Sequence, residues 1–229
     1  MKNMSIAVVD YDCGNIHSAT KALELAMSNS AINGSVSLTK DPEKILNSDK
    51  LVLPGVGAFG SCIQKLKSID GLKEALDEAV LKKAKPILGI CIGLQLMATS
   101  SFEGGKHKGL NWIEGDVIPL DPSDAKLKVP HMGWNNIVVK KNHPVFQDIK
   151  ISDYYFVHSY KFSPLDSKTI ISSTNYGEDF VSSLGRDNIL GTHILLECCR
   201  KYGKIRKFIH VSTDEVYGES MIDVNENHK

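Results

Sequence analysis

The chain of 229 residues is long enough to bury one sizeable hydrophobic core, with room for a small appendage. It carries 27 basic and 27 acidic residues, and this formal net charge of zero gives no support for a nucleic-acid or membrane partner held by bulk electrostatics. No apolar run is long enough to cross a bilayer, and the short apolar stretch before Asp10 does not resemble a signal peptide.

The cysteines indicate a reduced, cytoplasmic protein. They are few and odd in number and form no C-x-x-C pair, so neither a disulfide framework nor a zinc site is expected. The eight histidines lack the spacing of metal ligands, and the sequence predicts no metal and no cofactor. The cysteines are Cys13, Cys62, Cys91, Cys198 and Cys199.

The first hundred residues predict strands that alternate with helices, a pattern typical of a parallel sheet with helices on both faces. An apolar β-rich run at 5–9 is followed by a turn and by a helix at 16–29, where apolar residues recur at helical spacing. Further strands are predicted at 36–39, 50–53 and 86–89, and further helices from about residue 61, at 71–84 and at 94–100.

After Gly104 the pattern changes to short β-like runs with no helix of comparable length between them. The sequence shows no internal repeat and no low-complexity linker that would separate this part from the first. The predicted runs are 115–119, 134–139, 154–158 and 169–173.

The strongest chemical signal is the segment Gly89-Ile90-Cys91-Ile92-Gly93. A glycine two residues either side of a nucleophile, between a strand and a helix, is the nucleophile-elbow pattern. The tight turn leaves no room for side chains at the flanking positions, and a helix N-terminus favours the thiolate of Cys91 over the thiol. The alternative is a structural cysteine whose glycines only allow close packing, but the carboxyl end of a parallel strand favours a site.

A second glycine-rich segment, just after the third predicted strand, allows two interpretations. Gly55, Gly57 and Gly60 match the G-x-G-x-x-G pattern of dinucleotide-binding proteins. Pro54 interrupts the junction, however, and no acidic residue ends a following strand about twenty residues on. The interpretation that we favour is an oxyanion hole, in which these glycines free a backbone N–H and Ile92 supplies the other donor.

Four segments of the sequence carry a family resemblance: VLPGVGAF at 52–59, GICIGLQLM at 89–97, VPHMGWN at 129–135 and YFVHSY at 155–160. In order and spacing they resemble the glutaminase subunit of imidazole glycerol phosphate synthase, a class I glutamine amidotransferase. The opening residues 10–15 are similar too. The resemblance runs from about residue 4 to about residue 190.

The resemblance implies a three-layer α/β fold of the class I glutamine amidotransferases, with a parallel-rich central sheet and helices on both faces. It also implies a reaction. Cys91 attacks the side-chain amide of glutamine, forms a glutamyl thioester and releases ammonia. The ammonia passes to a cyclase subunit, the implied partner, and is used to make imidazole glycerol phosphate in histidine biosynthesis.

The resemblance further implies roles for residues around the nucleophile. Gln95, one helical turn beyond Cys91, would hold the substrate amide, and the backbone of Ser159 and Tyr160 would line the glutamine pocket. Without the family, Trp134 is equally well explained as a core residue, and His131 as a satisfied loop histidine. The implied oxyanion residues are Gly55, Val56, Gly57 and Ile92, and the implied cyclase contacts are His131, Met132, Gly133, Trp134 and Asn135.

The pattern breaks at the catalytic base. A cysteine glutaminase needs a histidine that moves the proton and a carboxylate that orients it. The family supplies both in a late His-Pro-Glu run, which this sequence lacks. In the family register Glu197 falls on the glutamate and Leu195 on the histidine, whereas His193 comes two residues early, about 6–7 Å away along a strand. His193 and Glu197 are therefore candidate substitutes for the missing pair.

The sequence from residue 185 to 218 carries a second resemblance, which explains why the His-Pro-Glu run is missing. It looks like an internal piece of a nucleotide-sugar 4,6-dehydratase of the dTDP-glucose type. This interpretation predicts a helix at 188–202, followed by a strand at 207–212. The chain has neither the N-terminal nucleotide-binding unit of that family nor its later Tyr-x-x-x-Lys.

We therefore expect a joined chain, with an amidotransferase domain at 1–184 and a foreign-looking α/β tail at 185–229 that is not an independent domain. The leading function is a glutaminase subunit that takes glutamine as substrate. One rival is an inactive relative that still binds the cyclase or glutamine, which a histidine near the Cys91 sulfur would argue against. The other is a nucleotide-sugar enzyme, which cofactor binding would reveal.

Overall fold

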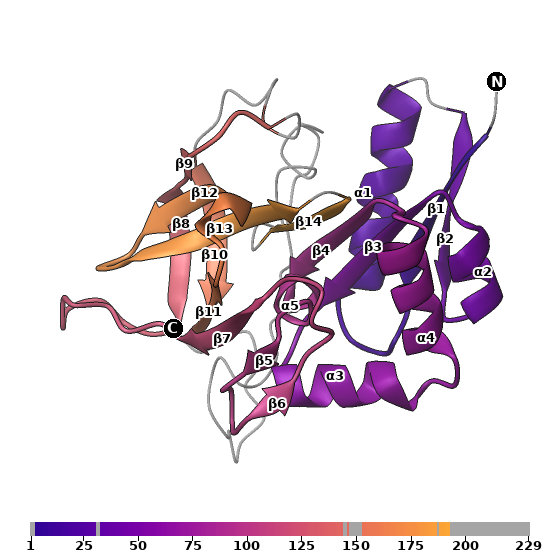
Figure 1. The fold of residues 1–229 in the computed structure, drawn as a ribbon. Helices are drawn as coiled ribbons and strands as arrows, with labels where there is room; N and C mark the ends of the chain where they lie inside the picture. Colours follow the sequence, from indigo (N-terminus) through magenta and orange to yellow (C-terminus); the bar gives the residue numbers. More distant parts are fainter. Residues whose placement is uncertain (1–2, 31–32, 144–145, 147–152, 187, 193–229) are drawn as a thin grey trace, which may run out of the picture.

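An eight-stranded sheet forms the centre of the structure (Figure 1). The computed structural model describes residues 3–30, 33–143, 146, 153–186 and 188–192. Neighbouring strands pair parallel from β2 to β14 and antiparallel from β14 to β9. In sheet order the strands are β2 (Gly34–Thr39), β1 (Met4–Val9), β3 (Lys50–Gly55), β4 (Ile87–Cys91), β14 (Ile189–Thr192), β13 (Asp179–Arg186), β12 (Ile170–Asn175) and β9 (Val138–Val139).

Helices pack on both faces of the parallel part of this sheet, as the alternating pattern predicted. In β1, Ile6 and Val8 face one hydrophobic cluster, whereas Ala7 and Val9 face another, because successive side chains of a strand point to opposite sides. The first cluster is covered by α1 (Ile16–Asn29). The second is covered by α2 (Pro42–Asn47), α3 (Phe59–Ser68), α4 (Leu72–Asp77) and the π-helical turn η1 (Glu78–Lys82).

Two smaller sheets follow the parallel half. The β-like runs expected at 115–119 and 154–158 are strands of these sheets, the run at 169–173 falls on β12 of the central sheet, and the run at 134–139 is divided between the two. One of the smaller sheets pairs β8 (His131–Asn136) with β10 (Asp153–His158). A third hydrophobic cluster lies here and includes Phe156 and Phe180. The other sheet has the order β11 (Tyr160–Pro164), β7 (Gly115–Pro119), β5 (Ser100–Ser101) and β6 (His107–Lys108); the short helix η3 (Ser167–Thr169) follows β11.

The helix predicted at 94–100 is wrong in its extent. Helix α5 spans only Ile92–Gln95, and the chain turns before β5. The carbonyl of Leu96 accepts a hydrogen bond from the backbone N–H of Leu110, and that of Met97 accepts one from Trp112. These acceptors would be needed for the next helical turn, so long-range backbone pairing ends the helix.

The helix predicted from residue 188 is also wrong for the residues that the structure describes there. Residues 189–192 form β14, which pairs parallel with β4 and antiparallel with β13. Asn188 fixes the entry to this strand, since its side-chain amide donates to the carbonyls of Val80 and Lys85 at 3.0 and 2.6 Å. Residues 193–202 of the predicted helix lie outside the described residues.

Among the described residues, no helix combines the length and the apolar character that crossing a membrane would require.

Candidate active site

Cys91 lies where β4 ends and α5 begins, at the predicted elbow. Its φ of 54° is a left-handed value that is uncommon for a residue other than glycine. A Cβ on Gly93 would lie 1.8 Å from the carbonyl oxygen of Leu53, and one on Gly89 would lie 2.9 Å from the carbonyl oxygen of Gly93. Both glycines are therefore required by close packing, as the elbow pattern predicted.

The glycine-rich segment at the end of β3 lies against this elbow. Gly55 pairs with Cys91 in the sheet, and a Cβ on Gly55 would come within 2.8 Å of the Gly93 nitrogen. The buried hydroxyl of Tyr11 donates to the Pro54 carbonyl at 2.6 Å and braces the segment from the side of β1. Gly57, with φ of 109°, allows the chain to turn away. The segment expected to form the oxyanion hole and Cys91 are thus brought together.

The charge state of Cys91 differs from the expectation of a stabilised thiolate. Burial raises the pKa of its thiol to about 11. The backbone N–H of Ile92 opposes this shift of the pKa by hydrogen bonding to the sulfur, and the negative charge of Glu103 adds to it. Helix α5 has a single turn, so its N-terminus contributes too little to offset burial.

A carboxylate occupies the place that a dinucleotide would need. Glu103 accepts a hydrogen bond from the backbone N–H of Phe59, the first residue of α3, at 2.7 Å. A pyrophosphate bound by a G-x-G-x-x-G segment lies at such a helix N-terminus. The negative charge of Glu103 there disfavours the dinucleotide interpretation of Gly55, Gly57 and Gly60.

Gln95 is fixed at one end and unsatisfied at the other. Its side chain is only 2% exposed, and its Nε2 donates to the carbonyl of Tyr160 at 3.3 Å. Its Oε1 is buried and has no hydrogen-bond partner among the described residues. An unsatisfied buried acceptor is costly, and a bound substrate with an N–H group would satisfy it. The Tyr160 carbonyl thus contacts Gln95, whereas the Ser159 carbonyl accepts a hydrogen bond from the backbone N–H of Leu120.

The segment at 131–135, which was expected to face a partner, has exposed and buried side chains in alternation. Met132 and Trp134 on β8 are 48% and 60% exposed, and Trp134 packs edge-on against Tyr155. His131 is 2% exposed and stacks on Phe156, so the prediction of a surface contact for His131 is wrong in this structure. The alternation of the strand places neighbouring side chains on opposite faces.

The candidate base lies outside the described residues, since His193 and Glu197 both come after the end of β14. In the described part of the chain, no histidine hydrogen-bonds to Cys91. Thr192 pairs with Ile90, so the described residues end beside β4, one residue before the position that would pair with Cys91.

Two residues that contact the candidate site were not predicted from the sequence. Tyr11 lies in a segment that resembles the family, but nothing local indicates that its hydroxyl reaches a carbonyl 43 residues away. Glu103 comes after a predicted helix that does not extend so far, and its approach to α3 depends on the turn that replaces this helix. Both contacts are long-range and leave no periodic signal.

Comparison with family models assigns most of the chain to one family. The model described as glutamine amidotransferase class-I matches residues 8–192. A second model, GDP-mannose 4,6 dehydratase, matches residues 181–229. The two matches share residues 181–192, which include the end of β13 and all of β14.

Curated relatives and solved structures agree with the first match. Proteins described as imidazole glycerol phosphate synthase subunit HisH are 46% identical in Brucella suis and 45% identical in Agrobacterium fabrum, each covering 82% of this chain and 89% of the relative. The same subunit from Zymomonas mobilis is 42% identical and covers 89% of this chain and 94% of the relative.

The fold is also that of known glutamine amidotransferases. A crystal structure of a glutamine amidotransferase has a TM-score of 0.59 at 12% identity, over 86% of this chain and 95% of that one. A glutamine amidotransferase from Thermotoga maritima has a TM-score of 0.58 at 14% identity, over 88% of this chain and 81% of that one. At these identities the likeness concerns the fold alone.

Proposed function

The chain belongs to the class I glutamine amidotransferase family, within its branch of imidazole glycerol phosphate synthase HisH subunits, and we propose that Cys91 is the nucleophile with which it hydrolyses glutamine. The ammonia released would pass to a cyclase subunit in histidine biosynthesis. The single observation that carries the proposal is the elbow at Cys91, where Gly93 fits against the end of β3 only without a side chain.

The chemistry that this geometry supports is acyl transfer to sulfur. The Cys91 thiolate attacks the side-chain carbonyl carbon of glutamine, and the carbonyl oxygen becomes an oxyanion. Backbone N–H groups from Val56, Gly57 and Ile92 would stabilise that charge. Collapse of the intermediate breaks the C–N bond, and the departing nitrogen takes up a proton, which an acid must supply, and leaves as ammonia. Water then hydrolyses the thioester to glutamate and the Cys91 thiol.

Two side chains would hold the substrate. The unsatisfied Oε1 of Gln95 offers an acceptor to an N–H group of glutamine. Glu103 lies close enough to raise the pKa of Cys91 and would pair with the α-ammonium group of the substrate. Binding of that cation would neutralise the charge that opposes thiolate formation, so substrate binding itself would help to activate the nucleophile.

The partner surface is part of the proposal. The exposed side chains of Met132 and Trp134 form an apolar patch at which aromatic residues commonly anchor a partner, and we assign it to the cyclase. Among the described residues the cysteines Cys13, Cys62 and Cys91 are free thiols, which supports a reduced, cytoplasmic compartment.

A second candidate function rests on the missing His-Pro-Glu run. The sheet continues through β14 to Thr192, so we place the end of the amidotransferase domain there rather than at residue 184. The sequence that only the dehydratase model matches then begins at residue 193, just before the position of the missing histidine. A chain with a complete elbow and no base would bind glutamine and the cyclase but turn over slowly.

The experiment that tests the proposal is covalent labelling with a glutamine-like diazo-ketone, followed by mass-spectrometric mapping. Cys91 should carry the label, free glutamine should protect it, and Cys91→Ser should abolish it. A label found mainly on Cys198 or Cys199, or one that glutamine does not reduce, would contradict the proposed function.

A further inference from the structure

A chain of hydrogen bonds links β8, β10 and the segment that contacts Gln95. The buried rings of His131 and His158 meet with 3.3 Å between His131 Nδ1 and His158 Nε2. On one side, the side-chain nitrogen of Asn135 lies 3.3 Å from His131 Nε2. On the other, His158 Nδ1 lies 2.9 Å from the carbonyl oxygen of Tyr160, which also accepts from Gln95.

The Asn135 end fixes the direction of this chain. Asn135 Nδ2 donates to the carbonyl of Asn175 at 2.8 Å, and Asn135 Oδ1 accepts from the backbone N–H of Asn136 at 2.8 Å. The amide therefore cannot be exchanged end for end, because both partners would then be mismatched. Its second N–H points to His131 Nε2, which must carry a lone pair.

The contact with the Tyr160 carbonyl fixes the tautomer of the second ring, that of His158. A carbonyl oxygen only accepts, so His158 carries a proton on Nδ1. His131, with Nε2 unprotonated, carries its proton on Nδ1 and donates it to His158 Nε2. Both rings are therefore neutral Nδ1–H tautomers. Burial, which lowers the pKa of His131 to about 4, and stacking of His131 on Tyr176 with 3.9 Å between ring centroids agree with this assignment.

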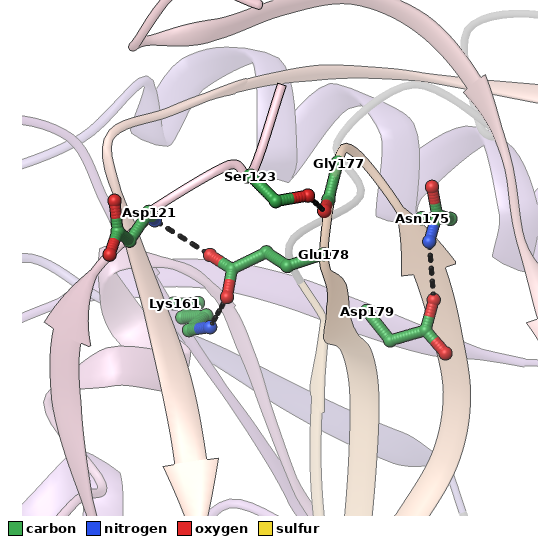
Figure 2. A network of polar contacts seen from close by, with 7 residues as sticks. All are labelled: Asp121, Ser123, Lys161, Asn175, Gly177, Glu178 and Asp179. Carbon is green, nitrogen blue, oxygen red and sulfur yellow. Dashed lines mark hydrogen bonds and ion pairs between the residues drawn. The ribbon is translucent and has the colours of Figure 1, made fainter. Parts of the chain in front are cut away.

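The turn that supplies the Asn175 carbonyl is itself held by polar contacts (Figure 2). Glu178 accepts a hydrogen bond from the backbone N–H of Asp121 at 2.7 Å and forms an ion pair with Lys161 of β11. Asn175 Nδ2 donates to Asp179 at 2.7 Å across the base of the turn. Strand β11 thus carries both Lys161, which holds the turn at the Asn135 end of the hydrogen-bond chain, and Tyr160, which forms the other end.

We propose that His158, oriented by His131, is a positioning residue for glutamine binding. It holds the Tyr160 carbonyl that fixes the Gln95 amide, and so leaves Gln95 Oε1 to face the substrate as an acceptor. This inference rests on the proposed glutaminase function. His158 acts through Tyr160 and Gln95 and not on the reacting atoms.

The tautomers provide a test that needs no activity. Long-range proton–nitrogen NMR spectra of the full chain with ¹⁵N-labelled histidines, recorded at pH 7, should show two buried neutral rings protonated on Nδ1. Their signals are assigned by loss in His131→Phe and His158→Phe. A charged ring, or an Nε2–H tautomer at either position, would overturn the hydrogen-bond chain.

Glutamine affinity tests the positioning role. Calorimetry is carried out in a Cys91→Ser background, which prevents turnover. His158→Phe, which keeps the ring but loses the donor, should weaken binding about three- to tenfold, the effect of one neutral hydrogen bond. His158→Asn, whose amide can take the place of Nδ1–H, should bind within about twofold of the parent.

A second variant and a folding control complete the design. His131→Phe should weaken glutamine binding in the same direction, and circular dichroism melting identifies any variant that has lost its fold. Equal affinity of the parent and the folded His158→Phe or His131→Phe would refute the positioning role. A Cys91→Ser parent that binds no glutamine would refute the proposed function instead, while the NMR result would still test the hydrogen-bond chain.

Discussion

Strands β4 and β14 are neighbours in the central sheet, run parallel and pair in register from Ile189–Ile87 to Thr192–Ile90. They differ in the segments to which they lead. β4 runs directly into an elbow in which Gly89 and Gly93 have no space for a side chain. β14 ends the described residues, and the sequence beyond it matches a dehydratase family and lacks the His-Pro-Glu run.

The contrast shows that pairing of a strand places looser demands on the sequence than catalysis does. β14 needs only a backbone that can pair, an apolar Ile189 and a small residue where Gly191 packs against Leu94. Residues 189–192, which both family models match, meet these requirements. A base, by contrast, must be one particular side chain in one place.

Restoring the base should produce the largest change. The double variant Leu195→His/Leu196→Pro rebuilds His-Pro-Glu with the resident Glu197 in the family register. General acid–base help contributes about a hundred- to ten-thousand-fold, and we expect glutamate release with the cyclase to rise by such a factor. The matched control is Leu195→Asn/Leu196→Pro. Equal rates in the two variants would show that the register assumed beyond β14 is wrong.

The pH dependence of alkylation should separate the nucleophile from another thiol of the same core. With a pKa of about 11, Cys91 without substrate should react about tenfold faster for each pH unit between 7 and 10, because only the thiolate attacks. Interaction with Cys62 lowers the pKa of Cys13 to about 7, so the rate of its reaction should level off near pH 8. Site-resolved mass spectrometry measures both. A plateau for Cys91 below pH 9 would mean that the free enzyme already holds a thiolate.

A single methyl group should damage the elbow. Gly93→Ala places a Cβ on the Leu53 carbonyl, and overpacking of this kind costs about 1–3 kcal/mol in free energy of unfolding, or more. Gly104→Ala is the control, since its Cβ would meet nothing within 4 Å and only its φ of 62° is unfavourable. Urea unfolding compares the two. Equal midpoints would contradict the tight fit of the elbow.

A substitution at the partner surface should have a smaller effect, on cyclase affinity alone, and should leave the elbow at Cys91 unchanged. Trp134→Ala removes the exposed aromatic anchor and should weaken cyclase binding about tenfold, in the range of a small interface hot spot. Leu165→Ala, also an exposed apolar residue, serves as the control. Calorimetric titration with the cyclase gives both affinities. An unchanged affinity in Trp134→Ala would move the interface elsewhere.

The sequence was sufficient where function depends on local pattern. Apolar residues at helical spacing predicted helix α1 at its observed bounds, and the glycines around Cys91 predicted the elbow. The apolar periodicity gave wrong predictions where backbone hydrogen-bond partners come from distant parts of the chain. The carbonyls of Leu96 and Met97 are taken by residues 110–113, and the run at 189–192 fits a strand or a helix until β4 and β13 decide.

Other parts of the site could not have been predicted because they depend on distant contacts. The Tyr11 hydroxyl meets the Pro54 carbonyl across 43 residues, and Gln95 meets Tyr160 across 65. His131 was expected near the surface with its segment, but the alternation of β8 turns it inward. Such contacts depend on the register of strands that are assembled only in the folded protein.

We infer that this chain has a complete elbow at Cys91 and lacks the catalytic base. The most direct measurement is glutamate release by the purified chain with the cyclase subunit and its nucleotide substrate, beside the Zymomonas mobilis relative under the same conditions. We expect a rate at least about a hundredfold below that of the relative, and no further loss in His193→Ala. A rate equal to that of the relative, abolished by His193→Ala, would contradict the claim and identify His193 as the base.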